Sequence, residues 1–425
     1  SRNMRIRYAP DTHQHNDFLT GICELPVRGG DVQLLASARA ELGYPVKPVT
    51  DGARIEMGEV VFEVLETPGH TPEHISLLVT DRSRGEEPSL LLSGGALLVG
   101  DVARPDLLGG REETERHAAE MCRMLRKKIL TLPDFIEVYP THVAGSLCGG
   151  AIGSRLSTTI GYERRMNGVL ARLDSEGAFV EKCLDLKDLP AVPPYWPRMR
   201  KLNQQGPPPL GTLREPIALS PDAFEEKANT GAIVLDCRSE EAFAAHIPEA
   251  LNVGIGASFA TWAGTVLPPD KPIILVLEHS ADLSEVCRQL LRIGYDIPEG
   301  WLAGGMLAWR TAAKPLETLP QIDVWQLRRK IEKGDGTIVI DVRQPKEWTA
   351  GHIRGAVHIT GAEFPERIGE IPQDRSVAMI CGSGYRSSVT ASLLQSTGRT
   401  QIFNVLGGMT AWKKAGLPTV SESCS

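Results

Sequence analysis

Residues Val377–Ser388 read Val-Ala-Met-Ile-Cys-Gly-Ser-Gly-Tyr-Arg-Ser-Ser, so that one cysteine stands between an apolar run and a segment of helical composition. The run Val377–Ile380 predicts a buried strand, and Val389–Gln395 predicts a helix. A thiol at a strand-to-helix turn is surrounded by backbone N–H groups and faces a helix N-terminus, and both favour the thiolate. The pattern therefore predicts that Cys381 is a nucleophile rather than an inert buried thiol.

This stretch belongs to an internal repeat that occupies residues 215–425. One copy contains Ile233–Arg238 and the other Ile338–Arg343, each ending in an Asp-x-Arg phrase. Both copies continue with His-Ile-x-x-Ala and then with Gly-Gly-Met-x-Ala-Trp, which ends at Trp309 and at Trp412. Strands that alternate with helical segments predict a parallel sheet covered by helices on both faces, which binds ligands at the carboxyl ends of its strands.

Both copies resemble rhodanese domains over their whole length. The resemblance implies that Cys381 attacks the outer sulfur of a donor and carries a sulfane sulfur as a persulfide. The backbone amides of the loop would then stabilise the persulfide anion. The loop residues to which the resemblance assigns substrate binding are Gly382, Ser383, Gly384, Tyr385 and Ser387. Arg386 closes a six-residue loop of the length that suits sulfur rather than phosphate, and it is expected to attract an anionic donor such as thiosulfate or to brace the loop through a carboxylate such as Glu347.

The first copy has no thiol at the corresponding place. An offset of 103 between the copies, read at the Gly-Gly phrase, places Glu278 opposite Cys381. We expect this copy to be inactive, because a carboxylate stands where an anion would have to bind. Cys237 is no substitute, since it lies in the Asp-x-Arg strand. A structural role or a dimer surface is the expected function of the first copy.

Four histidines of the N-terminal region each follow a predicted strand. His13 and His15 come after the run Met4–Tyr8, His70 follows the strand Val60–Leu65, and His142 follows the strand Phe135–Val138. Histidines two apart in an extended chain point to one side. With a carboxylate, Asp17, two residues further on, these imidazoles could begin a metal site.

At these residues the chain resembles the persulfide dioxygenase branch of the metallo-β-lactamase superfamily. The characteristic phrases stand at 67–74, 99–110 and 157–165. The resemblance implies an αββα sandwich and one Fe(II) held by two histidines, matching His13 and His70, and by an aspartate. The aspartate position is Gly95 in this chain, and Phe18 stands where the family has a further histidine. The family's opening strands have no counterpart in this sequence, so the sandwich is expected to be N-terminally incomplete.

These departures make the metal site degenerate as the family defines it. Without a carboxylate at position 95, His15, Asp17 and His142 are the residues that could complete the site, for instance as a zinc site. Fe(II) and Zn are therefore the candidate ions, and a site without an ion is the rival expectation.

The segment Pro190–Pro209 is rich in proline and predicts a stiff, extended linker in which Tyr195 and Trp196 dock on a domain surface. The predicted domains are therefore a metallo-β-lactamase-like domain with this linker over residues 1–206, an inactive rhodanese-like domain over 207–315, and an active one over 316–425. The fold class is α/β and multidomain.

Composition excludes several other functions. The net charge of −7 and the absence of a Lys/Arg-rich run argue against nucleic acid and anionic membrane as partners. Eight cysteines without a Cys-x-x-Cys pair fit reduced thiols, and no signal peptide is evident, so a cytoplasmic location is expected. A homo-oligomer is among the assemblies open to the chain.

The sequence thus predicts a sulfur-metabolising enzyme. A C-terminal sulfurtransferase is fused to a persulfide dioxygenase-like domain, and its partners are small persulfides, thiosulfate, sulfite and thiols such as glutathione or coenzyme A. Three alternatives stay open: a sulfurtransferase with a non-catalytic scaffold, a persulfide carrier or sensor without turnover, and a zinc hydrolase of the glyoxalase II type. The last needs two metal ions, and Phe18 and Gly95 each remove a residue that such a site uses.

Overall fold

The computed structural model describes residues 5–421, the side chain of Asp188 excepted. The chain forms two compact units. One comprises the residues up to Val192 together with Pro197–Leu210, and the other comprises Pro193–Trp196 and the residues from Gly211. None of the described helices is long and apolar enough to cross a membrane.

The first unit contains two sheets. The larger has the strand order β4-β5-β6-β7-β8-β9, and the smaller is the parallel sheet β1-β2-β3. The strands are β1 (Tyr8–Pro10), β2 (Gln33–Ser37), β3 (Lys47–Val49), β4 (Arg54–Met57), β5 (Val60–Glu66), β6 (Ile75–Asp81), β7 (Leu90–Gly94), β8 (Glu137–Pro140) and β9 (Thr158–Thr159). The helices are α1 (Glu24–Gly29), α2 (Arg111–Met124), α3 (Ile160–Met166), α4 (Glu176–Leu184) and α5 (Trp196–Gln205).

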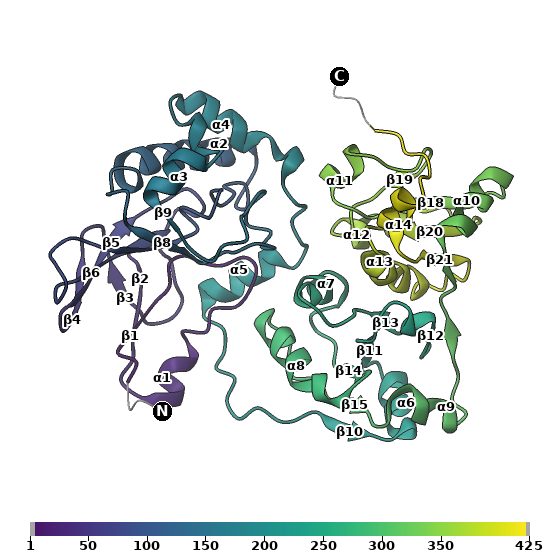
Figure 1. Cartoon of the computed structure of the whole chain (residues 1–425). Helices are drawn as coiled ribbons and strands as arrows, with labels where there is room; N and C mark the ends of the chain where they lie inside the picture. The colour runs from purple at the N-terminus through teal and green to yellow at the C-terminus, as the bar shows by residue number, and fades with distance from the viewer. Residues whose placement is uncertain (1–4, 422–425) are drawn as a thin grey trace. The chain divides into compact units, whose positions relative to one another are not determined.

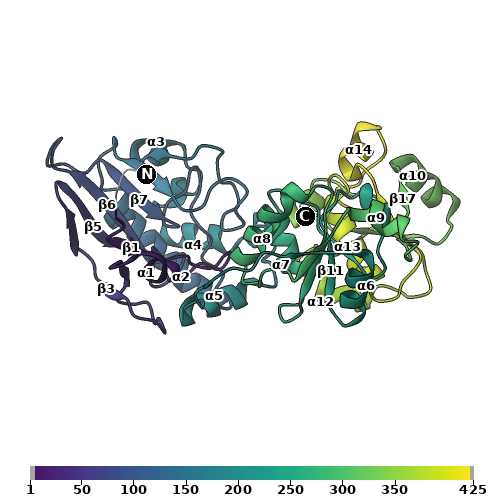
Figure 2. The same cartoon turned by 90° about the horizontal axis from the view of Figure 1, so that it is seen from below.

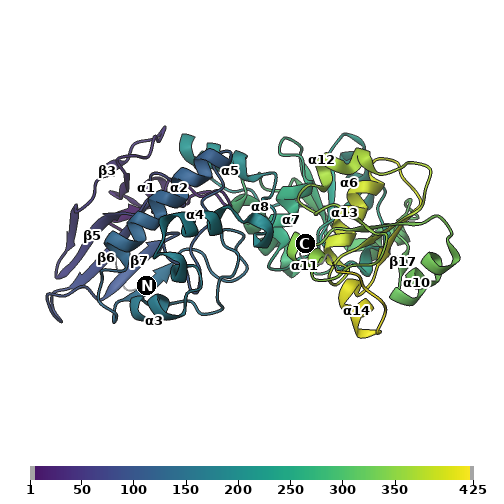
Figure 3. The same cartoon turned by 90° about the horizontal axis from the view of Figure 1, so that it is seen from above.

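Alternation along the central strands divides this unit into layers. Leu77 of β6 faces a core that it shares with Leu35 of β2 and Val49 of β3. The next residue, Leu78, faces the opposite core, formed with α2 and α4. Side chains two apart on a strand share a face, so one side of the larger sheet packs on the smaller sheet and the other on helices. Figures 1 and 3 show α2 and α4 side by side next to the sheet.

The second unit contains two five-stranded parallel sheets, with the orders β10-β15-β14-β11-β13 and β17-β21-β20-β18-β19. Their strands are β10 (Ile217–Leu219), β11 (Ile233–Asp236), β13 (Leu251–Asn252), β14 (Ile273–Val276), β15 (Gly300–Leu302), β17 (Gln321–Ile322), β18 (Ile338–Asp341), β19 (Val357–His358), β20 (Val377–Ile380) and β21 (Ile402–Val405). A short antiparallel pair, β12 (Ala245–His246) and β16 (Glu317–Thr318), lies outside them.

Helices accompany both sheets. They are α6 (Pro221–Asn229), α7 (Phe259–Val266), α8 (Leu283–Arg292), α9 (Gly305–Thr311), α10 (Val324–Lys333), α11 (Pro345–Thr349), α12 (Phe364–Arg367), α13 (Tyr385–Gln395) and α14 (Gly408–Lys414). The repeat, the parallel sheets, and the strand and helix around Cys381 are as predicted. The strands β14 and β20 are central and every residue in them is buried, which explains their unbroken apolar sequences.

Two sequence predictions need correction. The strand expected over Met4–Tyr8 begins only at Tyr8, and Met4 lies outside the described residues. The proline-rich segment is not extended throughout, because α5 occupies Trp196–Gln205. Its proline, Pro197, lies in the first turn, where a helix needs no N–H donor, and the next proline is beyond the helix end.

The two copies of the repeat share a core. One buried cluster includes Val276 and Met306 of the first copy as well as Phe364 and Ala391 of the second. At the same boundary, a Cβ atom built on Gly361 would lie 2.3 Å from the ring of Trp262. The ring therefore packs directly on the backbone of the second copy, and any side chain at position 361 would displace it.

Replacing Gly361 with alanine is therefore expected to lower the free energy of unfolding by about 1–3 kcal/mol, because the buried ring of Trp262 has to move. Gly369→Ala is the matched control, since a Cβ atom there meets nothing within 4 Å. Denaturant unfolding of the two variants should separate them. Equal stabilities would contradict the packing described here.

Candidate functional site

The sulfur of Cys381 lies at the base of the loop between β20 and α13. Its Sγ accepts a hydrogen bond from the backbone N–H of Gly384 at 3.1 Å. The hydroxyl oxygen of Ser387 lies 3.4 Å from the sulfur and 2.7 Å from Oδ1 of Asn404, its nearest acceptor. The Cys381 side chain is fully buried. Donors of this kind, together with the N-terminus of α13, stabilise negative charge on sulfur.

The Gly-Gly phrase of the second copy holds the same loop from the other side. The first amides of α14, at Met409 and Thr410, donate to the carbonyls of Cys381 at 2.7 Å and of Gly382 at 3.0 Å. A Cβ atom on Gly408 would lie 2.3 Å from the carbonyl oxygen of Cys381, and the φ angle of Gly408 is +51°. Only glycine allows α14 to approach this closely. Because α14 binds these two carbonyls, the loop amides are free to face the sulfur.

Arg386, in the first turn of α13, is paired with a carboxylate. Its guanidinium donates to both carboxylate oxygens of Glu347 on α11, at 2.6 and 2.7 Å. This is the bracing contact that the sequence offered as one role of Arg386, and attraction of an anionic donor stays a prediction. Burial opposes ionisation of Glu347, but the hydrogen bonds and the charge of Arg386, together with the N–H of Gln344 and the charge of Arg343, outweigh it and hold the pKa of that carboxyl below its ordinary value.

The other phrases of the repeat are structural. Arg343 donates to Asp341 at 2.6 Å and to the carbonyl of Gly351 at 2.9 Å, and the ion pair is buried. The ring of His352 stacks on Trp348 with centroids 3.5 Å apart. The first copy repeats both contacts, with its own Asp-x-Arg pair and with a histidine stacked on a phenylalanine. These residues support the loop without reaching the sulfur.

The first-copy residue that is equivalent to Cys381 lies one position earlier in the sequence than expected. Strand pairing places Val276 and Ile380 opposite the aspartates of the two Asp-x-Arg phrases. The next residues, Leu277 and Cys381, are therefore equivalent, and the second glycine of each Gly-Gly phrase approaches the carbonyl of each. The assignment of Glu278 to this place was wrong, because the offset of 103 holds at the Gly-Gly phrase and is 104 at the strand. The first copy has one residue more between this strand and its Gly-Gly phrase, and it has leucine at the thiol position.

Removing the charge at position 347 should weaken the second unit in a pH-dependent way. Because the pKa of Glu347 is lowered on folding, the pair with Arg386 contributes above the ordinary glutamate pKa and is lost as pH falls through the folded value. The Glu347 side chain is 38% exposed, so we expect Glu347→Gln to cost only about 0.5–1 kcal/mol at pH 7. The cost should shrink below about pH 4.

Chemical denaturation of Glu347→Gln at the two pH values measures this difference. Glu366→Gln, a neutralised exposed carboxylate elsewhere on the same copy, is the control and should show neither effect. A cost for Glu347→Gln that is equal at both pH values would contradict the role of the ion pair.

The first unit gathers four histidines and a cysteine in its interior. The loops after β1, β5 and β8 supply His13 and His15, His70, and His142, all of them buried. The Nε2 atoms of His13 and His142 lie 3.3 Å apart. Potential ligand atoms of His13, His15 and His142 lie within 4.8 Å of one another, and so do those of His70, His142 and Cys148. The sequence singled out the four histidines but missed Cys148, although it stands in a small-residue loop shortly after His142.

Two of these imidazoles are oriented by a hydrogen bond at Nδ1. His13 uses Nδ1 in a hydrogen bond with Thr12 Oγ1 at 2.9 Å, and His70 uses Nδ1 with the carbonyl of Arg104 at 2.8 Å. In each ring this leaves Nε2 for the centre of the cluster. Metal-binding histidines in proteins are commonly fixed in this way.

A fifth histidine, His74, is excluded as a ligand. Its Nδ1 pairs with Thr67 Oγ1 at 2.8 Å, and its Nε2 accepts the backbone N–H of Gly95 at 2.7 Å. Both ring nitrogens are therefore occupied. A Cβ atom on Gly95 would lie 2.7 Å from Cδ2 of His70, so His70 fills the space where a longer residue would begin.

Burial keeps two imidazoles of the cluster neutral. It lowers the pKa of His70 to about 4 and the pKa of His142 to about 3. At neutral pH both rings carry a lone pair that can bind a metal ion. Burial also raises the pKa of Cys148 well above its ordinary value, so a nearby cation would be needed to ionise it. Asp17 stands beside the cluster, with its carboxylate oxygens 3.5 Å from Nδ1 of His15 and 3.6 Å from Nδ1 of His142.

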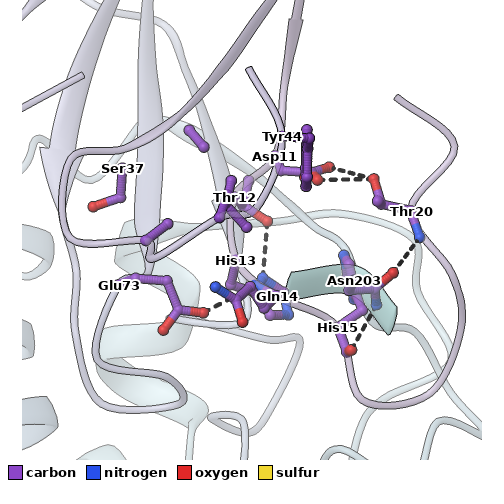
Figure 4. Close-up of a pocket in the computed structure, with 13 residues that line it drawn as sticks. Asp11, Thr12, His13, Gln14, His15, Thr20, Ser37, Tyr44, Glu73 and Asn203 are labelled. Carbon is purple, nitrogen blue, oxygen red and sulfur yellow. Dashed lines mark hydrogen bonds between the residues drawn. The ribbon is translucent and has the colours of Figure 1, made fainter. Parts of the chain in front are cut away.

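The helix α5 holds the histidine loop in place. The side chain of Asn203 donates to the carbonyls of His15 at 2.8 Å and Phe18 at 2.9 Å, and it accepts the N–H of Thr20 at 2.8 Å. Figure 4 shows Asn203 beside this loop and Thr20 bonded in turn to Asp11. The ring of Phe18 stacks on His15, with centroids 4.3 Å apart. Phe18 thus orients a neighbouring histidine.

Two arginines of the family phrases are engaged within the fold. Arg104 is buried and pairs with Asp106 through two hydrogen bonds of 2.7 Å, and it also donates to the carbonyl of Pro190 at 2.6 Å. Arg164 is bonded to Asp134 and to the carbonyl of Leu132 at 3.1 Å. Their contacts make both arginines structural.

Comparison with known protein families matches the second unit twice. The sequence model described as rhodanese-like domain matches residues 220–312 and 323–415. A protein called sulfurtransferase from Allochromatium vinosum is 34% identical over 24% of this chain and 94% of its own length.

The first unit resembles a different group of proteins. A human protein called persulfide dioxygenase ETHE1, mitochondrial, is 31% identical over 33% of this chain and 50% of its own length, so the chain covers only half of it. A crystal structure called metallo-beta-lactamase from Staphylococcus aureus is 30% identical, with a TM-score of 0.63 over 71% of this chain and 86% of its own. The fold class expected from the sequence is thereby confirmed.

Proposed function

Because the chain belongs to the rhodanese family through its two C-terminal domains, we propose that it is a sulfurtransferase whose Cys381 carries the transferred sulfur. The N-terminal part has the metallo-β-lactamase fold. The observation that carries the proposal is the setting of the Cys381 sulfur, which is buried and receives a hydrogen bond from the Gly384 N–H at the start of α13.

The transfer has two steps. The thiolate of Cys381 attacks the outer sulfur of thiosulfate, so that a new S–S bond forms, the S–S bond of thiosulfate breaks, and sulfite leaves with the electron pair. An acceptor thiolate then attacks the outer sulfur of the persulfide and takes it, and Cys381 returns as thiolate. The Gly384 N–H stabilises the sulfur anion that appears in each step.

Cys381→Ser is therefore expected to abolish sulfur transfer from thiosulfate to cyanide, because serine cannot hold a sulfane sulfur. Steady-state rates of the full chain measure this. Cys237→Ser, which changes a buried thiol of the first copy, should keep activity within about twofold. If Cys381→Ser were as active as the wild type, the assignment of Cys381 would be lost. Formation of the persulfide without turnover would instead indicate a carrier or sensor.

For the first unit we infer that the histidine cluster binds one transition-metal ion. The residues that would hold it are His13 and His142, with His15, His70 and Cys148 as the remaining donors. Imidazole and thiolate donors suit Zn and Fe(II). The ligand set differs from two histidines and an aspartate, because Gly95 supplies no carboxylate and its N–H is bonded to His74. When bound, Fe(II) would supply the oxygen chemistry of persulfide dioxygenases.

In that site the chain's own residues have separate tasks. Thr12 orients the ring of His13, and the Arg104 carbonyl orients the ring of His70. Asp17 supplies the negative charge nearest to the cluster, and its carboxylate would offset the positive charge of a bound ion. A neutral ligand set with one carboxylate beside it favours a single ion, whereas a hydrolase of the glyoxalase II type needs two.

Elemental analysis after separate anaerobic loading with Fe(II) and Zn(II) tests the ion. We expect the wild type to hold one ion stoichiometrically and His142→Ala to bind it more weakly by over about tenfold, because a ligand is lost. His117→Ala is the control, since this buried histidine of α2 contacts the Pro105 carbonyl and lies outside the cluster. Oxygen uptake on glutathione persulfide by the iron-loaded chain then decides between a dioxygenase and a scaffold. A wild type that binds neither ion would overturn the inference.

A further inference from the structure

The helix that follows Cys381 is buried on nearly every side. Seven residues of α13 are buried, and four of these seven are serine or threonine. The seven are Ser387, Ser388, Val389, Thr390, Ala391, Ser392 and Leu394. A helix packed only on its own sheet would expose a polar face. Figures 1 and 2 show why α13 does not, since α7 of the first copy lies beside it, and α13 also contacts β13. The catalytic helix therefore packs between both copies of the repeat.

Asn252 of β13 connects the first copy to this helix. Its Oδ1 accepts a hydrogen bond from the Ser388 hydroxyl at 2.6 Å, and its backbone N–H donates to Ser392 Oγ at 2.9 Å. Its Nδ2 donates to the carbonyls of Asp236 at 3.1 Å and Arg238 at 3.0 Å, which anchors the side chain in its own sheet. Asn252 is 2% exposed, so these bonds are made without competition from water.

A second contact reaches the loop itself. The hydroxyl of Tyr385 donates to the carbonyl of Gly254 at 2.9 Å. A Cβ atom on Gly254 would lie 3.2 Å from Cε2 of Tyr385, so the ring lies against the first copy's backbone. Tyr385 directly follows Gly384, whose N–H binds the Cys381 sulfur. The side chain of Tyr385 thus points to the first copy while its backbone belongs to the cysteine loop.

The equivalent position in the second copy makes no such outward contact. Strand pairing aligns His358 with Asn252, and His358 Nε2 bonds only to the carbonyl of Arg343, at 2.8 Å, among the hydrogen bonds of the described residues. On the first copy's own helix α8, Glu285 and Gln289 pair with each other at 2.8 Å. The hydrogen bonds that Asn252 makes to α13 therefore have no counterpart at His358.

We propose that the first copy is a positioning domain for the sulfurtransferase site, in which Asn252 and the Gly254 carbonyl fix α13 and Tyr385 so that the Gly384 N–H stays aimed at the Cys381 sulfur. This rests on the proposed function of Cys381. Asn252 and Tyr385 are positioning residues, since neither side chain touches the sulfur. The first copy lacks a thiol but still contributes to catalysis, because it packs against one side of α13.

Steady-state transfer from thiosulfate to cyanide by the full chain tests this with Tyr385→Phe and Asn252→Ala. Tyr385→Phe deletes one hydrogen bond and keeps the ring, so kcat should fall about five- to tenfold. KM for thiosulfate should stay within about twofold, because the Arg386–Glu347 pair is untouched. Asn252→Ala should lower kcat further. Gln289→Ala, which removes side-chain hydrogen bonds inside the first copy, is the control and should leave kcat unchanged.

Thermal melting of each variant shows that it is folded at the assay temperature. If Asn252→Ala does not fold, Tyr385→Phe alone decides. Wild-type kcat in the folded variants, with activity still abolished by Cys381→Ser, would overturn the positioning role and leave the proposed function standing. A kcat lowered equally in Gln289→Ala would also overturn it, because the effect would then be general destabilisation. Activity that survives Cys381→Ser would overturn both.

Discussion

The hydrogen bond from the Met409 N–H to the Cys381 carbonyl, 2.7 Å long, is the contact on which the sulfur site depends. A backbone amide and carbonyl in a tight loop point in roughly opposite directions, so binding the carbonyls on one side leaves the amides for the other. The bond forms only because Gly408 has no Cβ atom and a positive φ angle. The Gly-Gly phrase, which lies 26 residues beyond the cysteine in sequence, is therefore as necessary to the site as the loop.

The metal cluster depends on a different constraint, the satisfaction of every buried imidazole. Each buried ring has two nitrogens, and both need a partner within the protein or a bound ion, because water does not reach them. His74 has these partners in Thr67 and the Gly95 amide, and in this way it uses the space and the donor next to the vacant carboxylate position. His13 and His70 each have one nitrogen anchored and one turned inward. An ion at the centre would satisfy these inward nitrogens, and this is a physical reason to expect binding despite the loss of the aspartate.

Much of the fold and of both sites could be predicted because short sequence patterns indicate them. The apolar runs Ile338–Ile340 and Val377–Ile380 could only be central strands, and a cysteine after such a strand could be placed at its carboxyl end. Other features depend on distances along the chain that no local pattern gives. The offset read at the Gly-Gly phrase hid a one-residue difference between the strand and that phrase, so Glu278 was assigned to the place of Leu277. The proline content of Pro190–Pro209 predicted an extended linker, so neither the helix α5 nor the role of Asn203 on it was expected.

Asn252 shows the limit of such prediction most clearly. In sequence it is one polar residue at the end of a short strand, and its partners Ser388 and Ser392 are more than a hundred residues away. Serines in a helix predict exposure, yet these are buried because a second domain covers them. The first copy has the elements that maintain the shape of the domain, namely the buried Asp236–Arg238 pair and a Gly-Gly phrase, and it lacks the thiol. A domain that retains its shape without its nucleophile can still act through its surface, and here that surface places the buried, hydrogen-bonded side chain of Asn252 against α13.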